Sequence, residues 1–143
     1  MSLSKTLEEY VSACFTGLWI QSFEHDDALR EIAQMCREQD WRLTCWDIEQ
    51  GLQIPGGETP TEAGGTDPLA AIRAVNALAG PETSALLVLT NFHRFLQSAE
   101  IVQALAQQIV AGKQSRIFIM ILAPVVQIPV ELEKLFDVVE HDL

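Results

Sequence analysis

The chain has 143 residues, of which 48% are hydrophobic, so it can bury a full core as one domain without a metal or a disulfide. Lys and Arg total 9 against 20 Asp and Glu, which gives a formal net charge of −11 at pH 7. Such a surface repels phosphates and argues against nucleic acid or an anionic membrane as a partner. The net negative charge either serves only to keep the protein in solution or indicates a surface that docks on a basic partner.

The three cysteines, Cys14, Cys36 and Cys45, are odd in number and include no C-x-x-C pair. Each lies among apolar neighbours, which is typical of reduced thiols packed inside a cytosolic protein. The N-terminus shows no apolar signal segment. The longest apolar run, residues 117–126, is far shorter than the ~20 residues of a membrane span. We therefore expect a cytoplasmic protein.

Strand and helix patterns alternate along the chain. Helices are predicted at residues 4–14, 26–39, 68–79, 95–112 and 130–135, and strands at 18–23, 41–47, 86–89, 116–122 and 137–140. Asp67 and Pro68 form a helix start, with Asp67 as the N-cap. Residues 49–66 are rich in glycine and proline and predict a long flexible surface loop.

This order predicts a single α/β domain over residues 1–143. We expect a three-layer αβα sandwich around a mainly parallel, five-stranded sheet with right-handed crossovers. We expect this framework to be similar to that of P-loop NTPases but without a phosphate loop. In such sheets ligands bind beyond the carboxyl ends of the strands, so the residues there decide the chemistry.

The turn after the first strand lacks a phosphate loop. Residues 21–27 contain no glycine and no lysine. Instead, Glu24, Asp26 and Asp27 stand at the start of the next helix, where carboxylates cap the helix and complement its dipole. The same charges repel a phosphate from that position. We therefore expect no nucleotide binding here.

Other chemistries also lack their signatures. A phosphoacceptor domain needs an Asp at the end of the third strand, where this chain has Thr90 and Asn91. His93 could serve as a base, but with His25 and His141 it shows no zinc-site spacing. Ser22 lacks the glycines of a G-x-S-x-G elbow.

Two later segments resemble a known family. Residues 86–96 read L-L-V-L-T-N-F-H-R-F-L, and residues 123–132 read A-P-V-V-Q-I-P-V-E-L with its paired prolines. Both are similar to segments of a bacterial and plastid AAA-type ATPase family encoded by ycf-type open reading frames. Residues 18–24 and Trp46-Asp47 with Gly51-Leu52 are also similar, so the resemblance covers residues 18–143.

The resemblance implies the N-terminal region of a longer ATPase, a degenerate copy of the AAA fold that precedes the working module. ATP and Mg²⁺ are then implied only for that attached module, and no cofactor for this domain. A working module would place acids at Thr90 and Asn91, which cannot ligate Mg²⁺ as carboxylates would, and a polar sensor at Ala123-Pro124. These departures all remove catalysis.

We expect a non-catalytic regulatory or interaction domain that binds a protein partner at a strand-end rim formed by residues 21–27, 91–95 and 123–129. The candidate residues in this rim are Ser22, Glu24, His25, Asp26, Asp27, Asn91, His93 and Arg94. An alternative is a small enzyme that uses the polar cluster of this rim. A third hypothesis is self-assembly, because AAA proteins act as rings.

Overall fold

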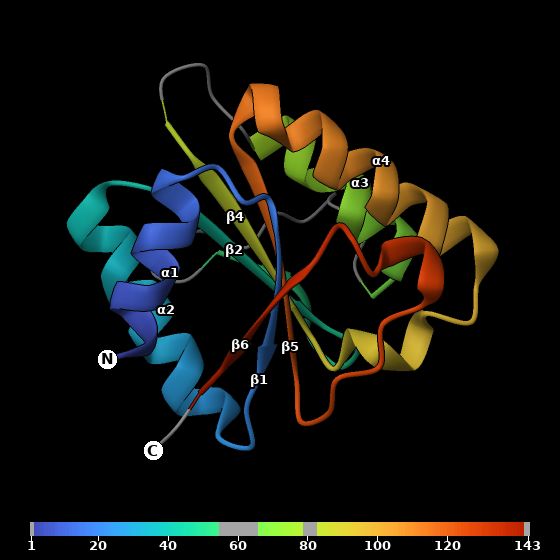
Figure 1. Cartoon of the computed structure of the whole chain (residues 1–143), viewed down its shortest axis with the longest axis horizontal. Helices are drawn as coiled ribbons and strands as arrows, with labels where there is room; N and C mark the ends of the chain where they lie inside the picture. Colours follow the sequence, from blue (N-terminus) through green and yellow to red (C-terminus); the bar gives the residue numbers. More distant parts are fainter. Residues whose placement is uncertain (1, 55–65, 79–82, 142–143) are drawn as a thin grey trace.

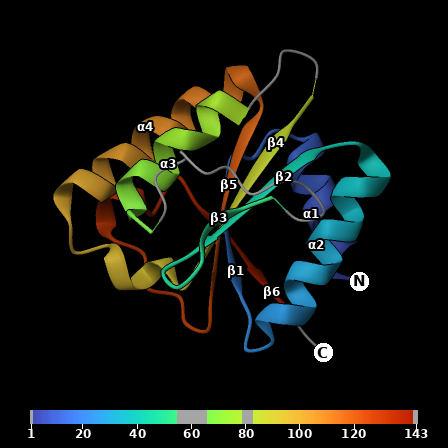
Figure 2. The same ribbon diagram turned by 180° about the vertical axis from the view of Figure 1, so that it is seen from behind.

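The computed structural model describes residues 2–54, 66–78 and 83–141. In chain order its elements are α1 (Leu3–Ser12), β1 (Gly17–Gln21), α2 (His25–Gln39), β2 (Arg42–Asp47), β3 (Gly51–Gln53), α3 (Pro68–Leu78), β4 (Ala85–Thr90), the 3₁₀ turn η1 (Phe92–Phe95), α4 (Ala99–Ser115), β5 (Ile117–Ala123), the 3₁₀ turn η2 (Val130–Leu132) and β6 (Asp137–Glu140). Helices α1 and α2 cover one face of a single sheet, and α3 and α4 cover the other (Figure 1). The view from behind shows the same three layers (Figure 2). The predicted three-layer αβα architecture is therefore confirmed.

The sheet contains six strands in the order β3-β2-β4-β5-β1-β6. Five neighbouring strands are parallel to one another, namely β2, β4, β5, β1 and β6. The remaining strand, β3, pairs antiparallel with β2. The prediction of a mainly parallel sheet is confirmed, but the predicted number of five strands is wrong. The sequence does not reveal β3, because a three-residue strand is too short to show a periodic pattern.

β3 lies inside the segment predicted as a flexible loop at residues 49–66. A tight turn joins it to β2, in which Asp47 Oδ1 accepts the backbone N–H groups of Glu49 (2.9 Å) and Gln50 (2.6 Å). Residues 49–54 of the predicted loop are therefore ordered by the turn and by pairing with β2. Residues 55–65 of that prediction lie outside the described part of the chain.

Alternate residues of the central strands fill two separate cores. On β4, Leu87 and Leu89 belong to the core beneath α3 and α4, whereas Leu86 and Val88 belong to the core beneath α1 and α2. All seven residues of β5 are buried. Continuous apolar strands of this kind form where a parallel sheet is covered on both faces, as the sequence predicts. The covered faces leave the ends of the strands as the accessible part of the sheet.

Two predicted helices differ from the structure. The helix expected at residues 95–112 starts later, because η1 comes first and α4 begins only at Ala99. There the Oγ atom of Ser98 accepts the N–H of Ile101 (3.4 Å), a helix start that the periodic pattern does not show. The helix expected at residues 130–135 is the single turn η2.

The predicted start of the third helix is confirmed. The Oδ1 atom of Asp67 accepts the N–H of Leu69 (3.1 Å) as α3 begins at Pro68. None of the helices that the structure describes is long and apolar enough to cross a membrane.

Candidate functional site at the carboxyl edge of the sheet

The predicted rim lies at one edge of the sheet, where the parallel strands β1, β2, β4 and β5 end. In Figure 1 this is the lower edge, where the turns after β1 and β5 lie side by side. β1 leads into α2 on one face, whereas the chain after β5 packs its Leu132 and Phe136 into the core of the other face. Neighbouring strands whose connections leave to opposite faces mark the usual ligand position in open α/β sheets.

The boundary between β1 and β5 is closed by hydrogen bonds. The indole Nε1–H of Trp19 donates to the carbonyl of Val125 (2.9 Å), and the Gln21 amide donates to the carbonyl of Pro124 (3.3 Å). The backbone N–H of Ser22 donates to the carbonyl of Ala123 (2.9 Å). Residues 123–125 are therefore tied over the end of β1, at the position where a ligand would approach.

The turn after β1 is built by Ser22 rather than by glycines. Its Oγ atom accepts the N–H of Glu24 (3.0 Å), and α2 starts at the next residue. Glu24 occupies the N-cap position but makes no side-chain capping bond, so the prediction of a cap by this carboxylate is wrong. Asp26 and Asp27 lie in the first turn of α2, where they complement the helix dipole, and Asp27 also pairs with Arg30. These acids keep the helix start unfavourable for phosphate.

Ser22 also belongs to a buried cluster that the sequence analysis missed. Its Oγ atom lies 2.7 Å from Nδ1 of His141, and Nε2 of His141 lies 3.2 Å from Oε2 of Glu31. The three residues come from the end of β1, from α2 and from the residue after β6, so no local motif marks them. The backbone N–H of His141 also donates to the carbonyl of Gln21 (2.9 Å).

A serine, a histidine and an acid joined in this order form the triad of many hydrolases. The burial of the Ser22 hydroxyl argues against hydrolysis here. Ser22 is 1% exposed, and its Oγ atom already accepts a backbone N–H. The His141 side chain is 2% exposed. A nucleophile must reach a substrate, and this hydroxyl does not reach the surface. The cluster instead ties the last strand to β1 and α2, and we call it the Ser22–His141–Glu31 clamp.

His93 and His25 both have an unpartnered ring nitrogen. His93 is buried, and among the described residues its Nδ1 atom and the Nε2 atom of His25 have no hydrogen-bond partner. Burial lowers the pKa of His93 below its usual value, with smaller contributions from the charges of Arg94 and His25. This shift favours the neutral form of the His93 ring. Within the described part of the chain, no cluster of three or more His, Cys, Asp or Glu side chains could hold a metal ion.

A hollow of about 280 Å³ lies beside His93 at the ends of β2, β4 and β5. Its lining residues are Asp47, Ile48, Thr90, Asn91, His93, Arg94, Phe95 and Pro124. Within the described residues no hydrogen bond joins His93 to Asp26 or Asp27, whereas His25 lies close enough to His93 to affect its pKa. Thr90 and Asn91 end β4 as expected, and the Asn91 backbone N–H donates to the carbonyl of Leu122 (2.8 Å).

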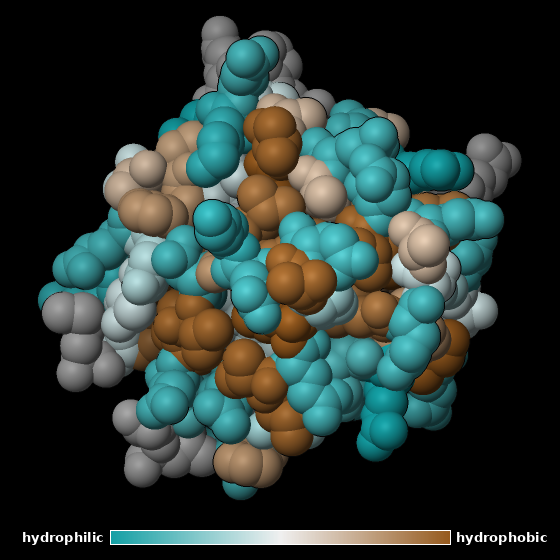
Figure 3. Space-filling view, turned by 45° about the vertical axis from the view of Figure 1, so that its right-hand side comes forward, coloured by the Kyte–Doolittle hydropathy of each residue, from teal (hydrophilic) through white to brown (hydrophobic). Residues whose placement is uncertain are grey.

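Several hydrophobic side chains are exposed along the same rim. Phe23 is 79% exposed in the turn after β1, and Ile48 is 55% exposed after β2. Val125 and Val126, after β5, are 36% and 41% exposed. The molecule turned by 45° shows hydrophobic side chains at the surface in groups between hydrophilic ones (Figure 3). The rim therefore combines exposed apolar groups with the acids at the start of α2.

A family model matches residues 3–141, nearly the whole chain. The model describes the N-terminal domain of SpoVK-like AAA ATPases. The chain belongs to this family. No curated protein matches the domain significantly, and no solved structure does so either. The resemblance found in the sequence is thus confirmed at the level of an AAA ATPase N-terminal domain.

Proposed function

We propose that this N-terminal domain is a non-catalytic interaction module with a degenerate nucleotide site, and that it binds a partner protein at its strand-end rim for an attached ATPase. We also propose the finer assignment to the ycf-type bacterial and plastid ATPases and a cytoplasmic location. The three cysteines, which are free thiols in the structure, support that location. The candidate contacts of the rim are Glu24, His25, Asp26, Asp27, Asn91 and Arg94, whereas Ser22 and His93 of the predicted set are buried and do not present their side chains to a partner.

The observation that best supports this proposal is the set of hydrogen bonds that joins residues 123–125 to β1 and to Ser22, the residue that follows it. Trp19 and Gln21 hold the backbone of residues 124 and 125 across the end of β1. A bound nucleotide needs backbone N–H groups that cradle phosphates at the start of the following helix. Here the first turn of α2 presents Asp26 and Asp27 instead. Binding a triphosphate would require both breaking these hydrogen bonds and overcoming the charge of two carboxylates.

The exposed side chains of the rim support protein binding. Phe23, 79% exposed, is next in sequence to Glu24, and Val126 is exposed on the neighbouring turn. Exposed apolar groups surrounded by charged ones are common at protein interfaces. The acids of the α2 start favour a partner surface that is basic at its edge.

The nucleotide part of the proposal is tested by titrating the chain with labelled ATP and Mg²⁺. We expect no saturable binding. Saturation in the micromolar range would overturn the claim of a degenerate site.

The interaction part is tested with two exposed-residue variants in the protein that carries the ATPase module. Phe23→Ser removes the apolar group of the rim, and Val110→Ser is the matched control, because Val110 is 57% exposed on α4 away from the rim. Proteins captured from cell extract by the unaltered protein should be lost with Phe23→Ser and kept with Val110→Ser. Equal capture by both variants would refute the rim as the binding surface. Sedimentation of the chain alone distinguishes self-assembly, which would appear as a concentration-dependent increase in mass.

A further inference from the structure

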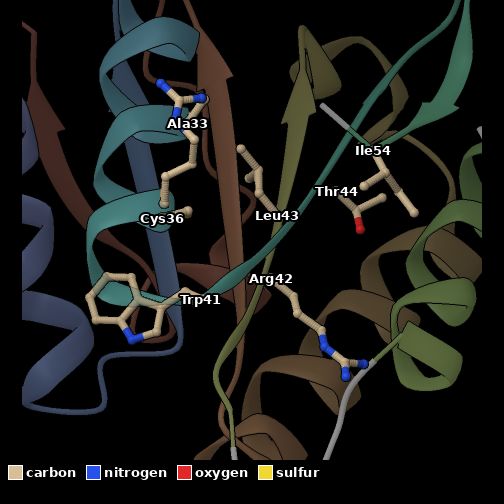
Figure 4. A pocket seen from close by; sticks show the side chains of 8 residues that line it. Ala33, Cys36, Trp41, Arg42, Leu43, Thr44 and Ile54 are labelled. Carbon is tan, nitrogen blue, oxygen red and sulfur yellow. The ribbon is translucent and has the colours of Figure 1, made fainter. Parts of the chain in front are cut away.

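A second hollow lies away from the rim, at the opposite end of β2. It measures about 390 Å³ and runs along the edge of the sheet between α2 and β2 (Figure 4). Its lining residues are Ala33, Cys36, Arg37, Trp41, Arg42, Leu43, Thr44 and Ile54. They come from the second half of α2, from Trp41 just before β2, from the first half of β2 and from the residue that follows β3. We call this hollow the β2-edge groove. Its volume falls within the range of ~300–1,000 Å³ that is usual for ligand sites.

The groove opens along the first half of β2, which has no neighbouring strand on the side away from β4 among the described residues. β3 pairs only with residues 45–47 of β2, so its register ends at the pair Cys45–Gln53. On the other side, the N–H of Arg42 donates to the carbonyl of Ser84 (2.9 Å), which turns the backbone groups of Arg42 and Thr44 toward β4. Because these groups alternate in direction along a strand, the N–H and C=O of Leu43 point toward the groove.

The pairing of β3 with β2 does not extend as far as Leu43 in the described residues. Within the described residues, no hydrogen bond from Leu43 to the groove side is present. The sequence places a proline at position 55, immediately after Ile54, and proline has no N–H to donate to a ladder. A strand edge with free donors and acceptors is a template for pairing with another extended chain.

The floor of the groove is apolar and chemically inert. Cys36 is 3% exposed and Leu43 is 9% exposed. Burial raises the pKa of the Cys36 thiol to about 12, and the nearby Cys45 adds to the effect. A thiol that stays protonated at neutral pH is a poor nucleophile, so Cys36 contributes an apolar surface rather than a covalent attachment point.

The groove also carries positive charge on an otherwise acidic chain. Arg37 and Arg42 both line it, although Lys and Arg number only 9 in a chain of net charge −11. Figure 4 shows Arg42 extending to the side of β2 opposite α2. Arg37 is exposed on α2 and makes no hydrogen bond or ion pair with another described residue. A guanidinium without a partner is suited to bind a carboxylate.

We propose that the β2-edge groove binds an extended segment of a partner protein, which adds to β2 as a strand. The segment pairs its backbone with the N–H and C=O of Leu43. It places an apolar side chain on the floor formed by Cys36 and Leu43 and a carboxylate against Arg37. Recognition of a peptide between a sheet edge and a helix derives affinity from backbone hydrogen bonds and specificity from the pockets beside them. This site is independent of the strand-end rim.

Amide hydrogen exchange of the whole chain tests the open edge directly. In the free protein, the amide of Leu43 should exchange faster than that of Arg42, which is bonded to Ser84. If Leu43 is already protected as strongly as Arg42, another part of the same chain occupies the edge, and the proposal is wrong.

Binding is then tested with a library of random 12-residue peptides displayed on phage, selected on the immobilised chain. Enriched peptides should carry an acidic residue beside apolar ones and should slow the exchange of the Leu43 amide. Arg37→Glu should weaken their binding by about tenfold or more. The control Lys113→Glu, which makes the same charge change at an exposed position on α4, should change it by less than about threefold. No enrichment, or equal losses in the two variants, would overturn the proposal.

Discussion

The Ser22–His141–Glu31 clamp offers the sharpest test of how this domain is held together. Replacing His141 with Ala removes the imidazole that joins Ser22 to Glu31. The clamp connects β6, the last strand, to β1 and α2, so its loss should loosen the end of the chain first. The substitution leaves the backbone hydrogen bond from residue 141 to Gln21 in place.

The expected loss follows from what each contact leaves behind. Ser22 is 1% exposed, so its hydroxyl group loses a hydrogen-bond partner that water does not readily replace, which costs roughly 1–3 kcal/mol. The contact with Glu31 contributes less, because its side chain is 35% exposed and water replaces the imidazole. Together the change should lower the free energy of unfolding by about 3 kcal/mol. For a chain of this size that lowers Tm by roughly 10 °C.

Urea unfolding followed by tryptophan fluorescence measures this change, since Trp19 and Trp46 are both at most 1% exposed. His25→Ala is the control, because Nε2 of His25 has no partner in the described structure, and it should cost less than about 1 kcal/mol. The double variant with Ser22→Ala should show strong coupling between Ser22 and His141. A loss below about 0.5 kcal/mol for His141→Ala would refute the clamp as a stabilising contact.

Two further predictions concern packing and pH. Gly112→Ala should unfold the domain at markedly lower urea in the same assay, because a Cβ atom at Gly112 would collide with the carbonyl oxygen of Ile117; an unchanged midpoint would contradict the close approach of α4 to β5. The lowered pKa of His93 means that the unfolded chain binds a proton more readily than the folded one, so stability should fall as pH drops below ~6.5, the ordinary pKa of histidine. Proton NMR titration should give a His93 pKa below that value, and His93→Gln should lessen the loss of stability at acid pH.

Much of the fold can be predicted from the sequence because it depends on the local periodicity of apolar residues. The apolar run of β5 and the alternation of strands with helices are sufficient to predict a parallel sheet covered on both faces. The departures fall where local signals are weakest. β3 has only three residues, and the break between η1 and α4 depends on Ser98, which the helical pattern passes over.

The candidate site likewise has some features that the sequence determines and others that it does not. The sequence by itself determines that residues 21–27 lack a phosphate loop and that Thr90 and Asn91 stand at the end of β4, because these are statements about residue type at strand ends. Segments 123–132 and 86–96 also suffice to indicate the AAA family, which the family match bears out at its coarser level.

Only the tertiary structure decides which distant residues meet. Ser22 and His141 are 119 positions apart, yet parallel pairing of β6 with β1 brings them within 2.7 Å. Likewise the bond from Trp19 to Val125 closes the ligand position because β1 and β5 are neighbours in the sheet, although 106 residues separate the two partners. Strand order is a property of packing, and no spacing along the chain records it. The absence of phosphate-loop residues at positions 21–27 is therefore determined by the sequence, whereas the contacts at the end of β1 depend on the order of the strands in the sheet.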